Sequence, residues 1–577
     1  MHDRPRYSRA RRLGRGTHLV GPVILLLTAF LVTFDANSAF AAYPTTPTGL
    51  TAKAASPTSI KLTWNASSYT SWYRVFRGGV LVRNNVTTTA LLDTGLAPVT
   101  SYSYQLAACS SVGCSAKSAL VSAKTPILPL TIPTGLAASA DTRAHVTVTW
   151  TPSPGATSYR VIRNGTSLPA QPSFSTYVDW NTAGSTAYSY VVKACNSTGC
   201  SSPSVAVSLT TPAVPPPPAC TGVSLTPTSS LQAAIDGHPG GTTFCLSAGV
   251  YHLAASVVPK SNDVLWGTSG TVLTGDGVTA DGIVGISTYQ QGVVIRALSA
   301  ERFTDSAIIL GNNWLVEDSE ISYAGGLGLQ LQDGATLRDD YFHHNGRRGF
   351  GGVDVHNVLV VGNEIAYNNT IHATDGSAGG AKVLMSDGVT FRNNYVHNNY
   401  FSGLHCDTDC INFTYEGNVI EGNTGKGLLY EKGYTATIRN NLIAGNDSLF
   451  AATTLNFGAN LRLNTSMDVE VYGNVIEATV PGTNGISLAD YDRGTGPLGT
   501  YALANDYVHD NVIRLLDGQS GLVGKTHDPT HANNRFVANH YYVPALSAQY
   551  FAWQAYPLTW KIWRSNGQDG TGTWSQG

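Results

Sequence analysis

The chain has 577 residues, which is too long for one ordinary domain and predicts two to four. Its composition, with 12% charged residues, 60 glycines, 28 tyrosines and 3 methionines, indicates a β-rich extracellular protein and argues against a cytosolic helical enzyme. The formal net charge is −2, and basic residues are concentrated at the N-terminus, so the remainder is mildly acidic. This charge argues against nucleic acid or an anionic membrane as the main partner.

The N-terminus has the three parts of a secretory signal peptide. A basic segment at 4–15 is followed by an apolar run at 20–34 and by the small-residue site Ala39-Phe40-Ala41. The apolar run is shorter than the ~20 residues that span a bilayer, so an uncleaved anchor is the less favoured alternative. We predict a signal peptide at 1–41 and a mature chain that is secreted, extracellular or wall-associated, with no membrane contact after cleavage.

Eight cysteines fall into four close pairs, which favours disulfides formed in an oxidising compartment. A zinc site is the alternative, but it needs a second close pair in the same fold and a nearby histidine, and only His405 comes close. The predicted disulfides are Cys109–Cys114, Cys195–Cys200, Cys220–Cys245 and Cys406–Cys410.

A repeat with a period of 86 residues predicts two tandem domains, at 46–125 and 131–211. Within each, short alternating segments are separated by Pro, Gly, Asn and Ser turns, a pattern typical of a β-sandwich with one buried Trp in its core. Residues that recur 86 positions later are Trp64, Tyr73, Tyr102, Tyr104, Cys109 and Cys114.

Both copies resemble fibronectin type III modules. Each opens with Pro-Thr-Gly-Leu, at 47–50 and 133–136, and carries the strand Trp and a Tyr-x-Tyr pair. The second copy departs from the pattern where Thr182 and Gly184 replace the Leu and Pro of the run at 96–104. The resemblance implies spacer or adhesive units, and neither copy holds a cluster of chemically active residues. A Pro-rich linker at 212–219 predicts a stiff spacer after them.

From residue 220 onward, a shorter repeat predicts a parallel β-helix. Two series of Asn (or Ser or Asp) positions run in register, mostly 21 to 24 residues apart, which is the length of one coil. Stacked coils would turn these side chains into amide ladders inside the turns. The first series is Ser319, Asp340, Asn363, Asn394, Asn418, Asn441, Asn474 and Asn511, and the second is Asn345, Asn368, Asn399, Asn423 and Asn446.

The ends of the predicted solenoid, 220–577, need covers because a β-helix exposes unpaired strand edges. At the N-terminal end, 229–236 reads as an amphipathic helix with a Ser cap, pinned by Cys220–Cys245. At the C-terminal end, the aromatic segment 541–574 is expected to form a closing layer rather than a sugar platform. The predicted fold class is therefore all-β: two fibronectin type III β-sandwiches followed by a right-handed parallel β-helix.

Insertions locate the working face, since extra residues grow where they do not disturb stacking. Long coils follow Asn368, Asn446 and Asn474, and the first two flank regular coils that would form a floor. Strand alternation there sends Leu404, Cys406, Leu428 and Tyr430 inward. It sends outward Lys382, His405, Asp407, Asp409, Leu429 and Glu431.

The spacing of the outward carboxylates predicts acid–base chemistry. Asp407 and Glu431 are 24 residues apart, as Asn394 and Asn418 are, so they should stack at about 5 Å. The diagonal from Asp409 to Glu431 is roughly 8 Å. These separations match retaining and inverting glycoside hydrolysis respectively, and both pairs remain open.

Residues 220–570 resemble secreted bacterial right-handed β-helix proteins of the pectin-lyase-like superfamily. The resemblance implies a scaffold shared by glycosidases, polysaccharide lyases, C5-epimerases and non-catalytic adhesins. This chain carries neither an Asn-Thr-Asp with a paired Asp-Asp nor an Asp-Pro-His-Asp motif, so the resemblance names no substrate.

We expect a monomeric polysaccharide hydrolase that needs no cofactor. Asp407, Asp409 and Glu431 would act as acid, base or nucleophile. Lys382, His405, Lys432 and Arg348 would bind substrate, although Lys382 and His405 could instead tune the pKa of the carboxylates. Arg348 belongs to a cluster with His343, His344 and Arg347 at the cleft edge. One alternative is a polysaccharide lyase or uronate epimerase, with Lys382 as base and Ca²⁺ on the carboxylates. Another is a non-catalytic glycan-binding or adhesive protein.

The pair Cys406 and Cys410 predicts a sharp turn. Four residues apart in an extended strand, two Cα atoms would be ~13 Å from each other, too far for a disulfide. We therefore expect the chain to turn at Thr408, which would hold Asp407 and Asp409 toward the cleft.

Overall fold

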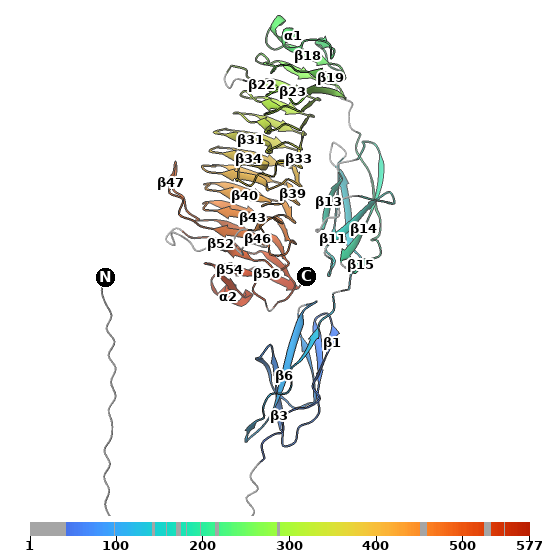
Figure 1. The fold of residues 1–577 in the computed structure, drawn as a ribbon, viewed down its shortest axis with the longest axis vertical. Helices are drawn as coiled ribbons and strands as arrows, with labels where there is room; N and C mark the ends of the chain where they lie inside the picture. The colour runs from blue at the N-terminus through green and yellow to red at the C-terminus, as the bar shows by residue number, and fades with distance from the viewer. Residues whose placement is uncertain are drawn as a thin grey trace, which may run out of the picture. The chain divides into compact units, whose positions relative to one another are not determined.

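The structure is a computed structural model that describes residues 42–576 apart from short gaps (Figure 1). The predicted signal peptide lies outside the described residues, as do 214–218 of the predicted linker. Among the residues described, no helix is long and apolar enough to cross a membrane. The gaps are 97, 128, 141–144, 157, 169–174, 180–181, 197, 214–218, 286–288, 451–457, 524–531 and 547.

The first module contains two antiparallel sheets. Its Trp64 ring packs edge-on against Tyr73, with 5.3 Å between ring centroids. Cys109 and Cys114 face each other on a hairpin and form the predicted disulfide. One sheet is β1 (Thr51–Ser56), β2 (Ser59–Thr63) and β5 (Ala90–Thr94); the other is β4 (Val80–Val86), β3 (Trp72–Arg77), β6 (Ser101–Ser110) and β7 (Gly113–Cys114), with β8 (Val121–Lys124) paired to β6.

The second module repeats this arrangement, as the 86-residue period predicts. Trp150, Tyr159 and Tyr190 lie in a core drawn from both sheets, and Cys195–Cys200 closes the equivalent hairpin. One sheet is β13 (Thr176–Asp179), β10 (Val146–Thr151) and β9 (Thr134–Ala140); the other is β12 (Thr166–Ser167), β11 (Ser158–Arg163), β14 (Ala187–Asn196) and β15 (Gly199–Cys200), with β16 (Val207–Thr210) paired to β14.

The remainder is a solenoid of three long sheets whose strands pair in parallel from coil to coil, which confirms the predicted β-helix (Figure 1). Sheet 1 contains β17 (Val223–Leu225), β18 (Thr243–Leu246), β20 (Val264–Trp266), β23 (Val294–Arg296), β26 (Leu315–Glu317), β29 (Thr336–Arg338), β32 (Leu359–Val361), β35 (Thr390–Arg392), β38 (Phe413–Glu416), β41 (Ala436–Arg439), β44 (Val469–Tyr472), β49 (Tyr507–His509) and β52 (Arg535–Val537).

Sheet 2 follows sheet 1 within each coil. Its strands are β19 (Gly249–His252), β21 (Thr271–Thr274), β24 (Ser299–Glu301), β27 (Glu320–Ser322), β30 (Tyr341–His343), β33 (Glu364–Ala366), β36 (Tyr395–His397), β39 (Val419–Glu421), β42 (Leu442–Ala444), β45 (Val475–Ala478), β50 (Val512–Leu515), β53 (His540–Val543) and β56 (Thr573–Gln576).

Sheet 3 completes each coil and carries the candidate site. Its strands are β22 (Ile283–Val284), β25 (Ile308–Ile309), β28 (Leu327–Gln330), β31 (Arg348–Val353), β34 (Gly379–Leu384), β37 (Ser402–Asp407), β40 (Leu428–Glu431), β43 (Ala459–Asn464), β46 (Asn484–Ala489), β51 (Ser520–Leu522), β54 (Phe551–Trp553) and β55 (Tyr556–Leu558), the last pair being antiparallel.

Both asparagine series form continuous ladders, as predicted. Between asparagines, the Nδ2 of one donates to the Oδ1 of the Asn one coil on, as from Asn394 to Asn418 at 2.9 Å. At the start of the first series, the backbone N–H groups of Ser319 and Asp340 donate to the Oδ1 atoms of Asp340 and Asn363 instead. The same Nδ2 also donates to a backbone carbonyl of the preceding coil, at 3.0 Å from Asn394 to Val360. Because the asparagines of the ladders are buried and hydrogen-bonded to the coils on either side, the ladders fix the coil-to-coil register that positions the outer face.

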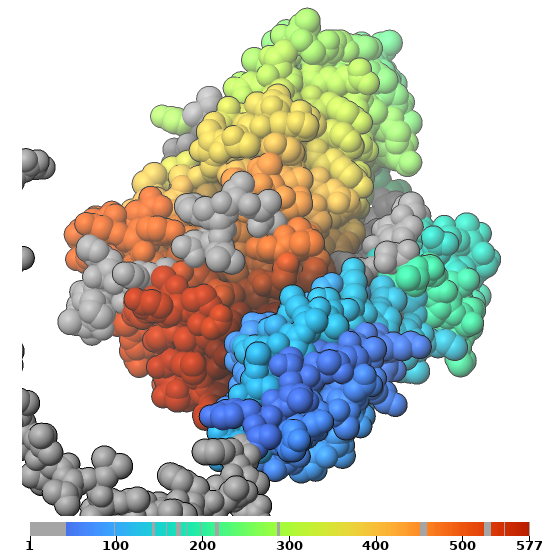
Figure 2. All heavy atoms as spheres, turned by 60° about the horizontal axis from the view of Figure 1, so that its bottom comes forward, coloured from blue at the N-terminus to red at the C-terminus, as the bar shows by residue number. Residues whose placement is uncertain are grey.

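Both ends of the solenoid are covered. At the N-terminal end, α1 (Leu231–Gly237) buries Leu231 and Ile235, with Ser230 as its N-cap, and Cys220–Cys245 forms the predicted disulfide. At the C-terminal end, α2 (Trp560–Ser565) places the fully buried Trp563 in the core. Figure 2 turns this end forward and shows its residues, coloured red, as a continuous packed surface.

Candidate active site

The site is built on four successive strands of sheet 3, β34, β37, β40 and β43. Their inward side chains, including Leu404, Cys406, Leu428 and Tyr430, lie in the solenoid core, as the alternation predicts. Their outward side chains form two rows that run from coil to coil. The first row is Lys382, His405, Leu429 and Arg462; the second is Leu384, Asp407, Glu431 and Asn464.

Asp407 is held by two lysines. Its Oδ2 accepts a hydrogen bond from Lys382 Nζ at 2.8 Å, and Lys432 Nζ lies 3.4 Å from its Oδ1. Burial by itself raises the pKa of Asp407, but the Lys382 hydrogen bond and the nearby positive charges outweigh it and hold the pKa well below its ordinary value. Asp407 is therefore ionised at any physiological pH.

Glu431 has a different set of partners. Its Oε1 accepts hydrogen bonds from Asn464 Nδ2 at 2.8 Å and Arg493 Nη2 at 2.7 Å. Burial and the Asp407 charge raise its pKa, whereas His405 and Arg493 lower it, with a net lowering. Arg493 is 39% exposed, so the protonation of Glu431 depends on a partner that solvent or substrate can reach.

His405 lies beneath the two carboxylates. Its Nε2 is 3.6 Å from Glu431 Oε2, too long for a hydrogen bond, and both ring nitrogens are buried without a hydrogen-bond partner. Burial and the nearby Lys382 charge lower the pKa of His405, and the neighbouring Glu431 and Asp407 only partly offset them. The sequence predicts that His405 either binds sugar or tunes a carboxylate pKa, and its buried ring nitrogens favour the second role.

The chain turns after β37 as the cysteine spacing predicts. Thr408 and Asp409 adopt positive φ angles of 63° and 54°, and Cys406 and Cys410 form a disulfide with their Cα atoms 6.3 Å apart. The turn carries Asp409 away from the other carboxylates, and its Oδ1 accepts a hydrogen bond from the hydroxyl of Tyr501. In the described part of the chain, the compact group is His405, Asp407 and Glu431, without Asp409.

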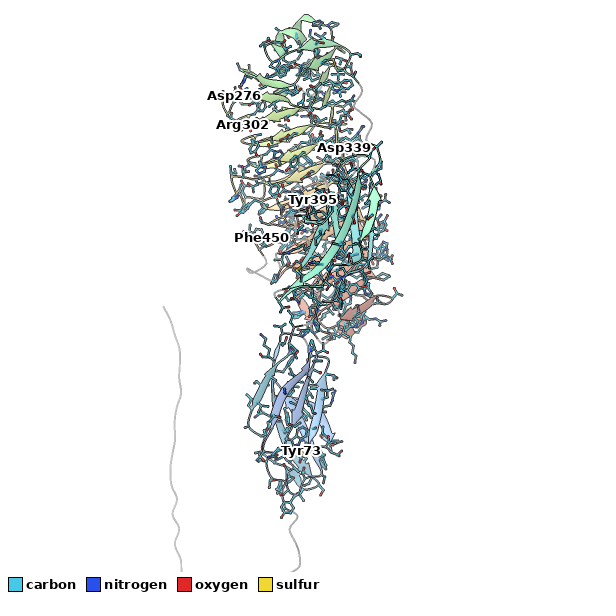
Figure 3. All side chains as sticks on the ribbon, turned by 90° about the vertical axis from the view of Figure 1, so that its right-hand side faces the viewer. Tyr73, Asp276, Arg302, Asp339, Tyr395 and Phe450 are labelled. Atoms are coloured by element: carbon cyan, nitrogen blue, oxygen red, sulfur yellow. A yellow bond between two sulfur atoms is a disulfide. The ribbon has the colours of Figure 1, made fainter. Side chains whose placement is uncertain are left out.

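The insertions line this face, although sequence reasoning used only their lengths. The first insertion places the carbonyl of Gly376 2.8 Å from Lys382 Nζ. The third, after β46, supplies Arg493 to Glu431, and its Tyr491 hydroxyl accepts from Arg462 Nη2 at 3.1 Å. The second insertion contains Phe450 (Figure 3), whose ring centroid lies 4.5 Å from Lys426 Nζ.

Two of the residues that sequence reasoning missed could have been found from spacing. Asn464 lies 33 residues after Glu431, the same interval that separates Asn441 from Asn474, and so it extends the carboxylate row. Arg462 follows Leu429 by the same interval. Arg493 carries no such signal, because it lies in an irregular segment.

His405, Asp407 and Glu431 are spaced as metal ligands would be, but the cations around them disfavour a metal ion. One ligand atom each from His405, Asp407 and Glu431 lie within 4.8 Å of one another. However, Lys382 and Lys432 surround Asp407, and Arg493 binds Glu431. Ca²⁺ takes six to eight oxygen ligands, and three adjacent cations would repel it. These residues do not fit the Ca²⁺ that the lyase alternative would use.

Family comparisons agree with this architecture. Residues 306–476 match the family described as right handed beta helix region, and residues 45–124 match the fibronectin type III domain. The chain therefore combines a fibronectin type III module with a right-handed β-helix.

Three curated relatives are similar over part of the chain. Exoglucanase B of Cellulomonas fimi is 37% identical over 183 residues, 29% of this chain and 17% of the relative. Chitinase A1 of Niallia circulans is 36% identical over 180 residues, which are 29% of this chain and 25% of the relative. Poly(3-hydroxybutyrate) depolymerase of Ralstonia pickettii is 38% identical over 110 residues, which are 19% of this chain and 22% of the relative. The chain spans about a quarter or less of the length of these relatives.

Among solved structures, the A-module of a mannuronan C-5 epimerase from Azotobacter vinelandii aligns with 60% of this chain and 93% of its own, at 19% identity and a TM-score of 0.40. A two-domain fibronectin type III segment of chicken tenascin aligns with 29% of this chain and 99% of its own, at 21% identity and a TM-score of 0.21.

Proposed function

We propose that the chain is a secreted enzyme that hydrolyses a polysaccharide with retention of anomeric configuration, using Asp407 as nucleophile and Glu431 as acid and base. The observation that carries the proposal is the distance between the carboxylates of Asp407 and Glu431. A carboxylate oxygen of Asp407 lies within 4.8 Å of one of Glu431, close to the ~5 Å of retaining enzymes and short of the inverting range. Both side chains reach solvent, at 20% and 14% exposure.

The unequal surroundings of the two carboxylates support separate roles. Asp407, ionised by its lysines, would attack the anomeric carbon while Glu431 gives its proton to the leaving sugar oxygen. Glu431 must be protonated for this step. Displacement of the exposed Arg493 by substrate would leave burial and the Asp407 charge to raise the pKa of Glu431.

The second half of the reaction follows from the same electrostatics. In the glycosyl-enzyme ester, Asp407 has lost its charge, so the pKa of Glu431 falls and its carboxylate can take a proton from water. That water attacks the anomeric carbon, and the ester bond to Asp407 breaks. The four disulfides support secretion of the protein. The relatives named as an exoglucanase and a chitinase support a polysaccharide as the substrate.

The test is release of reducing ends from a polysaccharide panel by the full chain. Asp407→Asn and Glu431→Gln should each lose at least about a hundredfold in rate, as expected for loss of a nucleophile or a general acid. Glu416→Gln is the matched control, because Glu416 lies on sheet 1 between two arginines, away from this face. NMR of the first product should show the retained anomer. Inverted product, or full activity in either variant, contradicts the assignment.

A second candidate is a lyase or epimerase acting on uronic acids. The observation that favours it is the set of cations around the carboxylates, Lys382, Lys432 and Arg493, which could neutralise a substrate carboxylate. A lyase leaves an unsaturated sugar that absorbs in the near ultraviolet, and an epimerase changes uronate configuration without cleavage. Glycan binding with no turnover would instead support the adhesive alternative.

A further inference from the structure

Arg348 lies on the same face, one coil before Lys382. It begins β31, where Gly351 pairs with Lys382 of β34. A Cβ atom built on Gly351 would lie 2.9 Å from Nη1 and 3.2 Å from Cζ of Arg348. The guanidinium therefore lies over the place where Gly351 has no side chain, in line with the row of Lys382 and His405.

This guanidinium differs from its neighbours because it has no acceptor among the described residues. Arg347 pairs with Asp375, Lys382 with Asp407, and Arg493 with Glu431. Among the residues that the structure describes, Arg348 has no ion pair and no side-chain hydrogen bond, and its Nε is buried without a partner. Burial and the adjacent Arg347 charge lower the pKa of Arg348, and the charge of Asp375, which forms no ion pair with Arg348, only partly offsets them.

A partly buried guanidinium without a direct ion pair or hydrogen-bond acceptor is costly unless a ligand supplies one. The planar guanidinium offers five donors in a fork that matches the paired oxygens of a carboxylate or a sulfate. Gly351 lies two coils before Asp407 and three coils before Glu431. The guanidinium therefore lies roughly 10 Å from Asp407 along the solenoid, at a neighbouring sugar.

We infer that Arg348 binds an anionic group, a carboxylate or a sulfate, on a sugar residue adjacent to the one whose bond is cleaved. This inference rests on the proposed function for the position of the reacting bond. It names the substrate class as an acidic polysaccharide, and it makes the bare Gly351 part of the subsite, because a side chain there would occupy the space above the floor.

The test measures binding without turnover, using Asp407→Asn in the full chain and affinity electrophoresis. The probes are a polyuronate, the same polymer with its carboxyl groups reduced to alcohols, and a sulfated polysaccharide. We expect tight binding of the polyuronate or the sulfated polymer, which distinguishes the two anions, and at least tenfold weaker binding of the neutral polymer. Adding Arg348→Ala should weaken binding of the charged polymer about tenfold and leave the neutral polymer unaffected.

Arg392→Ala is the control, because it removes a cation from sheet 1. Arg348→Lys keeps the charge without the fork, and it should show an intermediate loss even if the alanine variant folds poorly. Equal affinity for charged and reduced polymers, or equal effects of the Arg348 and Arg392 changes, overturns the inference. Residual cleavage by Asp407→Asn would count against the proposed nucleophile instead, since binding is scored separately.

Discussion

Removal of the Cys406–Cys410 disulfide should impair catalysis far more than stability. The bridge joins two cysteines that are 4 residues apart in sequence. The loop between them contains Asp407 and also Thr408 and Asp409, which have positive φ angles. So short a loop restricts the unfolded chain weakly, and the chain-entropy relation assigns it about 2 kcal/mol. For a solenoid of about 350 residues, an unfolding entropy of ~2 cal/mol/K per residue converts this into about 3 °C.

The experiment compares Cys406→Ala/Cys410→Ala with Cys220→Ala/Cys245→Ala. The second bridge spans 25 residues, so its loss should cost about 3.5 kcal/mol and about 5 °C while activity is retained. In the first variant, Asp407 loses the turn that places it between Lys382 and Lys432, so kcat for polysaccharide cleavage should fall at least tenfold with a smaller change in KM.

Thermal unfolding and polymer hydrolysis measured on both variants separate the two effects. Unchanged activity in the first variant, or mass spectrometry showing both thiols free in the secreted protein, would refute the reasoning. Cys406 would then be only a small core residue.

Three further perturbations test the fold and the electrostatics. Asn418→Ala removes a buried ladder residue that bonds Asn394, Asn441 and the carbonyl of Phe391, so unfolding by denaturant should show a loss of roughly 3 kcal/mol; a loss below 1 kcal/mol would argue against the ladder as a stabilising element. Burial raises the pKa of Glu477 to about 7 against the opposing Arg514. The folded state thus holds this proton while the unfolded state releases it near pH 4.3, so unfolding free energy should fall by up to about 1.4 kcal/mol per unit as pH rises from there to 7. Glu477→Gln should flatten that fall, and an unchanged slope would contradict the buried carboxyl. Arg493→Ala removes the cation 2.7 Å from Glu431 and should raise the pKa of Glu431 in the free enzyme, moving the corresponding limb of the pH profile of kcat/KM to higher pH; an unmoved limb would assign it to another group.

The sequence alone specified the sheets and the carboxylate pair, for a physical reason. In a parallel β-helix every coil bonds to the next at a fixed spacing, so equal intervals in sequence become direct neighbours in space. The 24 residues between Asn394 and Asn418 therefore also placed Asp407 beside Glu431, and the same arithmetic reaches Asn464. The 86-residue period likewise predicts the two sandwiches, because equivalent core residues recur at that interval.

Only the tertiary structure decided how the site is charged. Arg493 reaches Glu431 across 62 residues from an irregular segment whose path no local pattern encodes. Asp409, predicted with the other carboxylates, turns to Tyr501, 92 residues away, because the turn at Thr408 redirects the chain. Arg347 and Arg348 are adjacent in sequence, yet in the described part of the chain Arg347 forms an ion pair with Asp375 and Arg348 forms none. Periodicity determines which backbone positions are neighbours, whereas pairing and pKa depend on side-chain placement and burial, which emerge only when distant segments pack.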